Sequence, residues 1–365
     1  MEHEIVVVGA GITGCTLAER FAAAMGKRVL VLEKRPHIGG NCYDFVDEAG
    51  IMVPRYGPHF FHTDNAAVWD YLSGFTAWRP YEHQVLSWVD SKYVPVPVNI
   101  DTVNILFGLN IRDESEMEAW LKENTVSIEH PANSEESALA RVGPLLYEKL
   151  FKNYTIKQWS LHPRELDAAV MDRIPVRMNR DDRYFSDRFQ AMPAAGYTAM
   201  FERMLEHPKI TVVTGSDYFE AKGGLGDYER LVFTGPIDRF FDYRYGRLQY
   251  RSLYFKYRTL DIKFFQPRAQ INYPNDEEYT RITEPKHATG QKSDRTTIIE
   301  EYSTWDGEPY YPVLSGQNND LYRRYREAAA GLDGVVFAGR LAEYRYFNMD
   351  QAFANALQLF ERLRS

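Results

Sequence analysis

The stretch that decides the fold runs from residue 5 to residue 33. It begins with the β-branched run Ile5-Val6-Val7-Val8, which is followed by Gly9-Ala10-Gly11-Ile12-Thr13-Gly14 and by a helix-like segment over 16–25. A second apolar run, Val29-Leu30-Val31-Leu32, then ends in Glu33, 22 positions after Gly11. Two apolar runs joined by a glycine-rich turn and a helix predict a βαβ unit with parallel strands.

The three glycines of this unit, Gly9, Gly11 and Gly14, predict a phosphate-binding turn. They allow the backbone to approach a pyrophosphate, which would lie at the helix N-terminus, where free N–H groups point outward. Glu33 would accept hydrogen bonds from ribose hydroxyls. A glycine turn in an ordinary parallel sheet is the alternative. Strand, turn, helix, strand and acid in register favour a dinucleotide-binding domain.

Composition restricts the class of protein. The 365 residues suggest two or three domains, and a formal net charge of −8 argues against a general nucleic-acid surface. This charge leaves room for a phosphorylated small substrate, which needs only two or three local arginines. No apolar run approaches the roughly 20 residues of a membrane span. The chain enters a strand directly, so we expect no signal peptide and a cytoplasmic protein.

Cysteine usage agrees with that location. Cys15 and Cys42 are the only cysteines, and their spacing does not match a metal site. We expect both to be reduced structural thiols. No arrangement of Cys, His and acidic residues in the sequence indicates a metal centre or a hydrolytic triad, so we predict no metal site.

The rest of the chain divides into segments of different pattern. A helical pattern extends over about 102–154, and an Arg-, Asp- and Pro-rich stretch over 160–185 predicts an exposed loop. Short β runs between about 210 and 312 suggest a mostly antiparallel sheet. At the end of the chain, a strand runs into Gly339-Arg340, and a helix after Met349 places apolar residues on one face.

The strand, glycine turn and helix at the C-terminus suit a chain end that folds back onto the N-terminal unit. We therefore predict an α/β protein with a discontinuous Rossmann-like domain, an inserted α-helical domain and an antiparallel β-sheet domain. The predicted boundaries are 1–78 with 190–240 and 318–365 for the dinucleotide domain, 79–180 for the helical substrate or lid domain, and 181–189 with 241–317 for the sheet domain.

Seven blocks of sequence, in order, cover almost the whole chain and carry a resemblance to one family. The chain resembles the UDP-galactopyranose mutase family at Phe151-Lys152-Asn153-Tyr154-Thr155-Ile156-Lys157-Gln158-Trp159, Arg173-Ile174-Pro175-Val176-Arg177, Tyr184-Phe185-Ser186-Asp187, Thr234-Gly235-Pro236-Ile237-Asp238, Tyr279-Thr280-Arg281-Ile282, Glu308-Pro309-Tyr310-Tyr311-Pro312 and Gly339-Arg340-Leu341. A chance match to one block is plausible, whereas chance matches to seven in family order are not.

The resemblance implies a flavin-dependent isomerase that catalyses no net redox reaction. Such an enzyme interconverts UDP-galactopyranose and UDP-galactofuranose for cell-surface polysaccharide biosynthesis. The cofactor implied is FAD, active in its reduced form, whose N5 attacks the anomeric carbon while UDP leaves. The partner is a nucleotide-sugar substrate, with no nucleic acid, and we expect a homodimer.

The resemblance also assigns site residues. Arg173 and Arg281 match the two arginines that bind the diphosphate, a role suited to the planar guanidinium. Arg173 lies in the Pro-bounded loop, so it would close over the substrate and exclude water. His59 is expected beside the flavin, and Tyr311 and Tyr346 match tyrosines at the phosphates or the sugar.

Seven further residues are expected to bind substrate. Phe151, Thr155 and Trp159 match the family's uridine- and sugar-facing wall. Tyr154 and Tyr184 match tyrosines that bond the phosphates or line the sugar site, His83 falls near the ligand, and Asn272 matches a uracil-pocket position. The residues expected to bind FAD include the glycine turn, a second glycine turn and the start of the last helix: Gly9, Gly11, Thr13, Gly14, Glu33, Lys34, Gly40, Asn41, His59, Phe60, Arg340, Asn348 and Met349. Many relatives carry Asp where this chain has Asn348, so Asn348 is assigned a contact and no acid–base role.

Three alternatives remain open from the sequence. The same mutase chemistry on UDP-N-acetylgalactosamine or TDP-fucose is one, because several stretches, such as 286–291, differ from the better-known family members. An ordinary flavin oxidoreductase is another, since it would share the dinucleotide domain. The third is a nucleotide-sugar binding protein that keeps FAD as structure. The Arg173 motif weighs against this last alternative, because a pure binder needs no closing charge.

Overall fold

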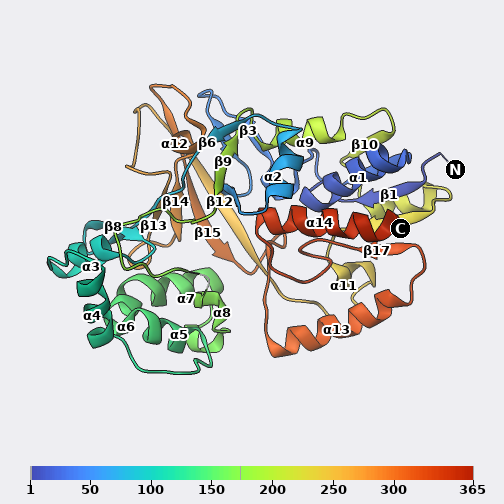
Figure 1. Cartoon of the computed structure of the whole chain (residues 1–365). Helices are drawn as coiled ribbons and strands as arrows, with labels where there is room; N and C mark the ends of the chain where they lie inside the picture. The colour runs from blue at the N-terminus through green and yellow to red at the C-terminus, as the bar shows by residue number, and fades with distance from the viewer. Residues whose placement is uncertain (1, 173, 365) are drawn as a thin grey trace.

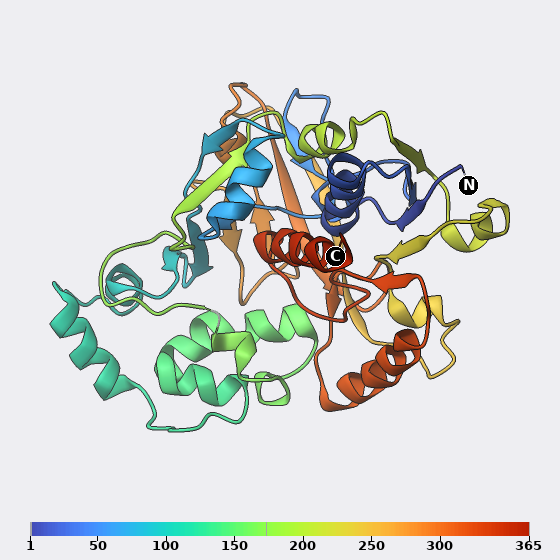
Figure 2. The same ribbon diagram turned by 45° about the vertical axis from the view of Figure 1, so that its right-hand side comes forward.

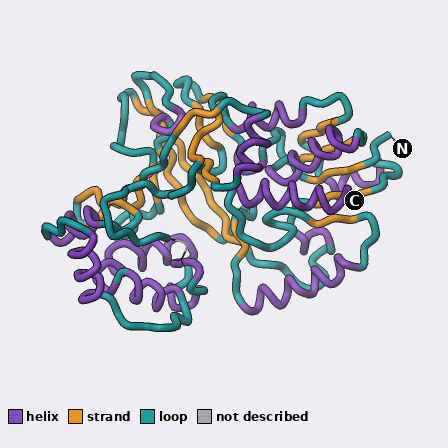
Figure 3. Tube along the Cα trace, in the orientation of Figure 1, coloured by secondary structure: helices purple, strands orange, loops and turns teal. Residues whose placement is uncertain are grey.

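The structure is a computed structural model that describes residues 2–172 and 174–364. Two sheets form its framework (Figures 1 and 3). The first sheet has five parallel strands in the order β10-β2-β1-β11-β17. Its bounds are β1 Ile5–Val8, β2 Val29–Glu33, β10 Ile210–Thr214, β11 Arg230–Phe233 and β17 Val335–Phe337.

The predicted βαβ unit is present, with α1 (Ile12–Met25) between β1 and β2. The prediction of antiparallel strands from about residue 210 is wrong for two of them, because β10 pairs parallel with β2 and β11 pairs parallel with β1. Short β runs show no strand direction in sequence, and these two strands acquire their direction only by pairing with distant partners. The fold class, an α/β protein with a Rossmann-like unit, is confirmed.

The two ends of the chain meet in this unit. The last helix, α14 (Met349–Arg364), lies beside α1, as the red and blue helices show in Figure 1. The ring of Phe360 packs edge-on against Phe21 at a centroid distance of 5.6 Å, and both side chains are fully buried. This packing brings the turn at Gly339 next to the glycine turn at Gly9, since the two strands that precede them, β17 and β1, both flank β11.

The second sheet has seven strands in the order β16-β12-β15-β14-β13-β7-β8. Neighbours are antiparallel except β13 and β7, which are parallel. The bounds are β7 Val85–Val89, β8 Lys92–Val96, β12 Tyr250–Leu260, β13 Gln270–Asn272, β14 Arg281–Thr283, β15 Thr296–Thr304 and β16 Tyr311–Pro312. Strands β7 and β8 lie within 79–180, the range predicted to be helical, so the helices begin only at Ile100.

The helical part has its own core of buried apolar side chains and extends away from the parallel sheet (Figures 1 and 2). Its helices are α3 Ile100–Phe107, α4 Glu114–Asn124, α5 Ser134–Arg141, α6 Gly143–Leu146, α7 Asn153–Trp159 and α8 Ala169–Asp172. A π-helical turn over Tyr147–Lys152 connects α6 to α7. Such turns are frequent at functional sites. This one contains Phe151 and leads directly into α7, which carries the predicted substrate residues Tyr154, Thr155 and Trp159.

Smaller elements connect these parts. Two short sheets are formed by β3 Asp44–Val46 with β4 Met52–Pro54, and by β5 Phe61–Thr63, β9 Phe189–Pro193 and β6 Trp78–Pro80. The remaining helices are α2 Ala66–Ser73, α9 Tyr197–Leu205, α10 Tyr218–Ala221, α11 Ile237–Phe240, α12 Lys286–Thr289 and α13 Gly316–Ala330. None of the helices within the described residues is long and apolar enough to cross a lipid bilayer.

Candidate active site

A cavity of about 630 Å³ opens at the carboxyl ends of the parallel strands. This end of a parallel sheet, next to helix N-termini, is where open α/β folds bind ligands. Eleven of the predicted FAD residues line it: Gly9, Gly11, Thr13, Gly14, Glu33, Lys34, Gly40, Asn41, His59, Arg340 and Met349. Phe60 and Asn348 do not line it. The Phe60 ring stacks on His83, and the Asn348 N–H donates to Gln351.

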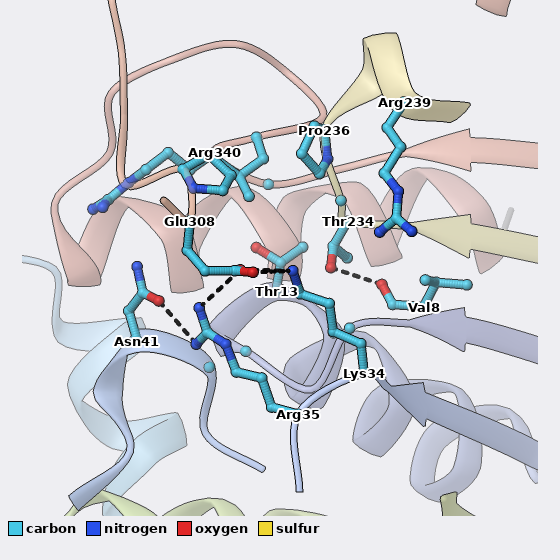
Figure 4. Close-up of a pocket in the computed structure, with 18 of the residues that line it drawn as sticks. Val8, Thr13, Lys34, Arg35, Asn41, Thr234, Pro236, Arg239, Glu308 and Arg340 are labelled. Atoms are coloured by element: carbon cyan, nitrogen blue, oxygen red, sulfur yellow. Dashed lines mark hydrogen bonds and ion pairs between the residues drawn. The ribbon is translucent and has the colours of Figure 1, made fainter. Parts of the chain in front are cut away.

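The glycine turn is shaped by close backbone contacts. Gly9 has a φ of +99°, and a Cβ there would collide with the Thr234 hydroxyl, which donates to the Val8 carbonyl (Figure 4). A Cβ at Gly14 would collide with the carbonyl of Gly9. Gly11 differs, because its nearest neighbour would lie 3.7 Å away, at the Gly40 Cα. The protein alone therefore does not require glycine at position 11, whereas a group in the cavity would.

Glu33 fixes the same turn from the end of β2. Its Oε2 accepts from the Ala10 N–H at 2.8 Å and its Oε1 accepts from the Arg35 N–H at 2.9 Å. A carboxylate has about four acceptor positions, so Glu33 can still accept from a ribose hydroxyl.

The Lys34 side chain, expected on the ribose side of FAD, forms an ion pair within the protein. Its Nζ lies 2.6 Å from the Glu308 carboxylate, which also lies 3.6 Å from the Arg35 guanidinium (Figure 4). Arg35 in turn donates to Asn41 Oδ1 at 3.0 Å and lies over the Tyr56 ring. Glu308 belongs to a quoted sequence block but was not predicted as a site residue. No local pattern pairs it with Lys34, because 274 positions separate the two.

A second group of charged side chains lies on one face of the seven-stranded sheet. Strand register places Ser87, Asn272, Arg281 and Glu301 in one row across β7, β13, β14 and β15. Arg281 Nη2 lies 2.7 Å from Glu301 Oε1, and Glu301 is only 2% exposed. Burial opposes the charge of Arg281, but the Glu301 carboxylate and nearby tyrosines raise its pKa well above the ordinary value. The guanidinium is therefore permanently charged.

This ion pair is not saturated. Within the described part of the chain, Arg281 Nε and Glu301 Oε2 are both buried and have no hydrogen-bond partner. A buried donor without a partner is costly, so a ligand that accepts from Arg281 would relieve it. The sequence analysis missed Glu301, because only strand pairing between β14 and β15 places it beside Arg281.

One guanidinium group and two tyrosine rings lie near the Arg281–Glu301 pair and form one wall of the site: those of Arg340, Tyr311 and Tyr346. The Arg340 guanidinium lies 5.6 Å from the Tyr311 ring centre and 5.4 Å from that of Tyr346. It donates to the Phe347 carbonyl at 2.6 Å, which ties this wall to the start of α14. Burial raises the pKa of Tyr311 to about 12, so its phenol keeps the proton and can donate to an anion.

His59 lines the cavity close to this wall. Its Nδ1 donates to the Gly57 carbonyl at 2.9 Å. Burial, and then the positive charge of Arg340, lower the pKa of His59 to about 4, so the imidazole is neutral at pH 7. With Nδ1 carrying the proton, Nε2 is left as an acceptor.

The predicted uridine wall lies on and before α7. Phe151 and Trp159 are buried, whereas Tyr154 and Thr155 are half-buried. The helix is attached to the sheet beside Asn272, because Lys157 Nζ donates to the Tyr273 carbonyl at 2.7 Å. The half-buried Tyr184 donates its N–H to the His83 carbonyl at 2.7 Å. Arg173 lies outside the described residues, so its role as a closing charge stays a prediction.

Arg251 is a further buried cation that the sequence analysis did not single out. It is 1% exposed, it pairs with Tyr311 in the β12–β16 register, and its Nε donates to the Gln158 carbonyl at 3.0 Å. Its two Nη atoms are buried without a partner among the described residues, and its guanidinium stacks on Trp305. The sequence alone does not distinguish Arg251 from the other arginines, because its burial depends on the contact of β12 with Gln158 on α7.

Comparisons with known proteins agree with this geometry. A family model described as UDP-galactopyranose mutase matches residues 149–346, and one described as an NAD(P)-binding Rossmann-like domain matches residues 7–75. The protein named "Probable UDP-galactopyranose mutase" from Klebsiella pneumoniae is 38% identical, over 99% of this chain and 94% of its own. The chain belongs to the UDP-galactopyranose mutase family. A dTDP-fucopyranose mutase from Escherichia coli is 35% identical, over 98% and 97% of the two chains.

Solved structures place the fold within a wider group. A crystal structure of reduced UDP-galactopyranose mutase has a TM-score of 0.78 at 19% identity and covers 99% of this chain and 94% of that one. A putrescine oxidase bound to putrescine has a TM-score of 0.58 at 12% identity, with 99% of both chains covered. Both likenesses show the fold. The family model and the relative from Klebsiella pneumoniae confirm the predicted mutase family and an isomerase of the mutase type.

FAD is the cofactor of this family, and the cavity fits it. The open space over Gly11, the acidic Glu33 at the end of β2 and the N-terminus of α14 at Met349 are what a dinucleotide with a negative flavin end requires. Gly11 and Gly40 would face the pyrophosphate, and His59 and Met349 would face the flavin.

Replacing Gly11 by Ala tests the fit of the cavity to FAD. Because a methyl group there meets only the cofactor, we expect FAD to bind at least about tenfold more weakly, equal to about 1.4 kcal/mol. Fluorescence titration of the apoprotein with FAD measures the affinity. The thermal unfolding of apo Gly11→Ala should match that of Gly223→Ala, a surface position with open space around it. Unchanged FAD affinity would contradict the assignment of the turn.

Two neutral histidines, the buried His83 and the half-buried His59, predict a pH dependence of stability. His59 and His83 have native pKa values of about 4 and about 3, below the ordinary 6.5, so below pH 6.5 the unfolded chain gains protons that the native state does not. The unfolding free energy should fall with decreasing pH between 6.5 and 4, by on the order of 1 kcal/mol per pH unit for each histidine. Urea unfolding across this range measures it.

His83→Gln should flatten this slope, whereas His130→Gln, at an exposed position, should leave it unchanged. Equal slopes for both variants would show that His83 is not buried as a neutral group.

Proposed function

We propose that this chain interconverts UDP-galactopyranose and UDP-galactofuranose. The observation that carries the proposal is an excess of positive charge, buried at Arg251 and half-buried at Arg281 and Arg340, beside the cavity. Arg281, Arg340 and Arg251 contribute three guanidinium groups, and among the described residues Glu301 is their only carboxylate ion-pair partner. The neighbouring His59 and His83 are neutral. Such a site attracts an anion, and a nucleoside diphosphate carries both the charge and the acceptor oxygens that the unpartnered N–H groups need.

The residues of this chain then have distinct tasks. Reduced FAD, when bound, would supply the nucleophilic nitrogen that attacks the anomeric carbon. Arg281 donates to the departing diphosphate, and its charge is worth most as negative charge builds on the leaving oxygen. The phenol groups of Tyr311 and Tyr346 donate to the phosphates or the sugar hydroxyls. His59 offers Nε2 as an acceptor to a sugar hydroxyl or to the flavin N5 proton.

The identity of the sugar nucleotide is the finer part of the proposal. The similarity to a dTDP-fucopyranose mutase makes TDP-fucose the second candidate substrate. We expect the purified protein, with its flavin reduced, to convert UDP-galactofuranose to UDP-galactopyranose, and chromatography or NMR of the product gives the ring size. UDP-N-acetylgalactosamine and TDP-fucose are offered in parallel. If only TDP-fucose is converted, the substrate is TDP-fucose and the proposal of UDP-galactose is wrong.

An ordinary flavin oxidoreductase makes a different prediction. It would consume oxygen in proportion to substrate, whereas the mutase needs only a catalytic amount of reductant. An oxygen electrode in the same assay therefore separates the two activities.

We also propose a cytoplasmic homodimer. Both cysteines are free and buried, which agrees with a reducing compartment. Light scattering of the same preparation tests the dimer.

Replacing Arg281 by Ala tests its role in departure of the diphosphate. We expect kcat to fall by about 10²–10³-fold, because an electrostatic donor to the leaving group is lost, while FAD content stays unchanged. Arg258→Ala is the matched control, since Arg258 lies in the same sheet on β12, two strands from Arg281, and its side chain is half exposed. A normal kcat with only a raised KM would limit Arg281 to ground-state binding.

A further inference from the structure

A chain of buried polar side chains runs along the face of the seven-stranded sheet that carries Arg281. The Tyr81 hydroxyl lies 3.3 Å from His83 Nδ1, and Gln270 Nε2 donates to Asn272 Oδ1 at 2.9 Å. Between these pairs, the Gln270 side chain lies close enough to His83 to raise its pKa, which is the effect of a group that accepts from the imidazole. His83, Gln270 and Asn272 are 3%, 5% and 8% exposed, so water does not compete for these bonds.

The hydrogen bonds of this series of side chains have a defined donor-to-acceptor direction. Burial and the charge of Arg281 lower the pKa of His83 to about 3, so its imidazole is neutral. Gln270 uses its amide nitrogen on Asn272 and therefore turns its carbonyl oxygen toward His83, which must donate. Since Tyr81 lies at Nδ1, the donor is Nε2–H, and Nδ1 accepts from the Tyr81 hydroxyl.

This direction fixes the amide of Asn272. Its Oδ1 is taken by Gln270, so the group left to face a ligand is the Nδ2 amino group. Nδ2 has no partner among the described residues and is absent from their buried unpartnered atoms, so it is open to solvent. Asn272 thus presents its amino group, a hydrogen-bond donor, to a ligand.

Asn272 lies where a nucleotide base would meet it. Strand register puts it directly beside Arg281, the predicted diphosphate ligand. On its other side, α7 is held against the sheet by Lys157 on the Tyr273 carbonyl and by Asn153 on Asn275. The helix carries Thr155 and Trp159, which belong to the predicted uridine- and sugar-facing wall. Asn272 therefore stands between the diphosphate position and the base wall.

We propose that Gln270 is a positioning residue that selects the base of the nucleotide: it holds Asn272 as a donor, and the site therefore accepts a base with a carbonyl at the edge that meets Asn272, as in uracil and thymine at O4, and rejects cytosine, which carries an amino group there. The inference rests on the proposed function, because it requires a nucleotide substrate. It concerns base selection only, so the choice of sugar is independent of it.

The test measures binding of UDP, dTDP and CDP to the FAD-loaded protein by isothermal titration calorimetry. UDP and dTDP should bind at least about tenfold more tightly than CDP, since the mismatched amino group leaves two donors facing each other. Asn272→Asp should reverse the preference, because a carboxylate only accepts.

Gln270→Glu is the decisive variant, since Gln270 itself need not touch the ligand. A carboxylate at 270 can no longer donate to Asn272, so the amide turns its Nδ2 toward residue 270 and presents Oδ1 to the base. The ratio of UDP to CDP affinity should then fall at least about tenfold and favour CDP. Gln266→Met is the matched control. Gln266 is equally buried, but its side-chain amide donates only to the backbone carbonyls of Arg268 and Ile282.

A second readout is independent of ligands. In ¹⁵N-histidine spectra, His83 should show the neutral Nε2–H form at pH 7. An Nδ1–H form would overturn the direction of the chain, and equal affinities for UDP and CDP in the unaltered protein, or an unchanged ratio in Gln270→Glu, would overturn base selection by Gln270. Tight binding of all three nucleotides would leave the proposed function standing, whereas no binding of any would remove both.

Discussion

The site depends on keeping several guanidinium groups charged in a place that excludes water. Arg281 is paired with Glu301 and Arg251 lies under Trp305, while Arg340 is held by backbone carbonyls. One carboxylate among the described residues offsets only part of this charge, and buried nitrogens of Arg281 and Arg251 have no acceptor there. Buried unpaired charge is expensive, and in the proposed function a nucleoside diphosphate supplies the missing acceptors.

The same positive field determines the state of the neighbouring histidines. His83 is buried and His59 is half-buried, and the charge of Arg281 acts on both, so protonating either would add to a charge that is only partly compensated. Neutral imidazoles can accept as well as donate, and each here is held in one tautomer by its neighbour. The histidines therefore act as fixed hydrogen-bonding groups whose direction is set by Gly57 in one case and by Tyr81 and Gln270 in the other.

Two unlike sheets share the work. The parallel sheet gives turns and helix N-termini, which suit the phosphates and the flavin end of FAD. The antiparallel sheet gives a flat face on which side chains from neighbouring strands stand in a row, as Asn272, Arg281 and Glu301 do. The ion pair between Lys34 and Glu308 joins the end of β2 to the loop before β16, so the cofactor cavity is closed by both parts. The C-terminal part of the chain completes the parallel unit, because β17 is the last strand of its sheet and α14 packs against α1.

The sequence by itself determined the glycine turn, its βαβ unit, the helix after Met349 and the family, because these features are local or are carried by blocks of consecutive residues. It also placed Arg281, Tyr311 and Arg340 in motifs. It could not show that β10 and β11 run parallel with β1, since a short apolar run has no direction until it is paired. Only the tertiary structure placed Glu301 beside Arg281, Glu308 beside Lys34, Arg251 beneath α7, and Gln270 between His83 and Asn272. Each of these contacts joins residues whose proximity depends on strand register or helix packing, and burial, which gives them their energy, exists only once the chain has folded.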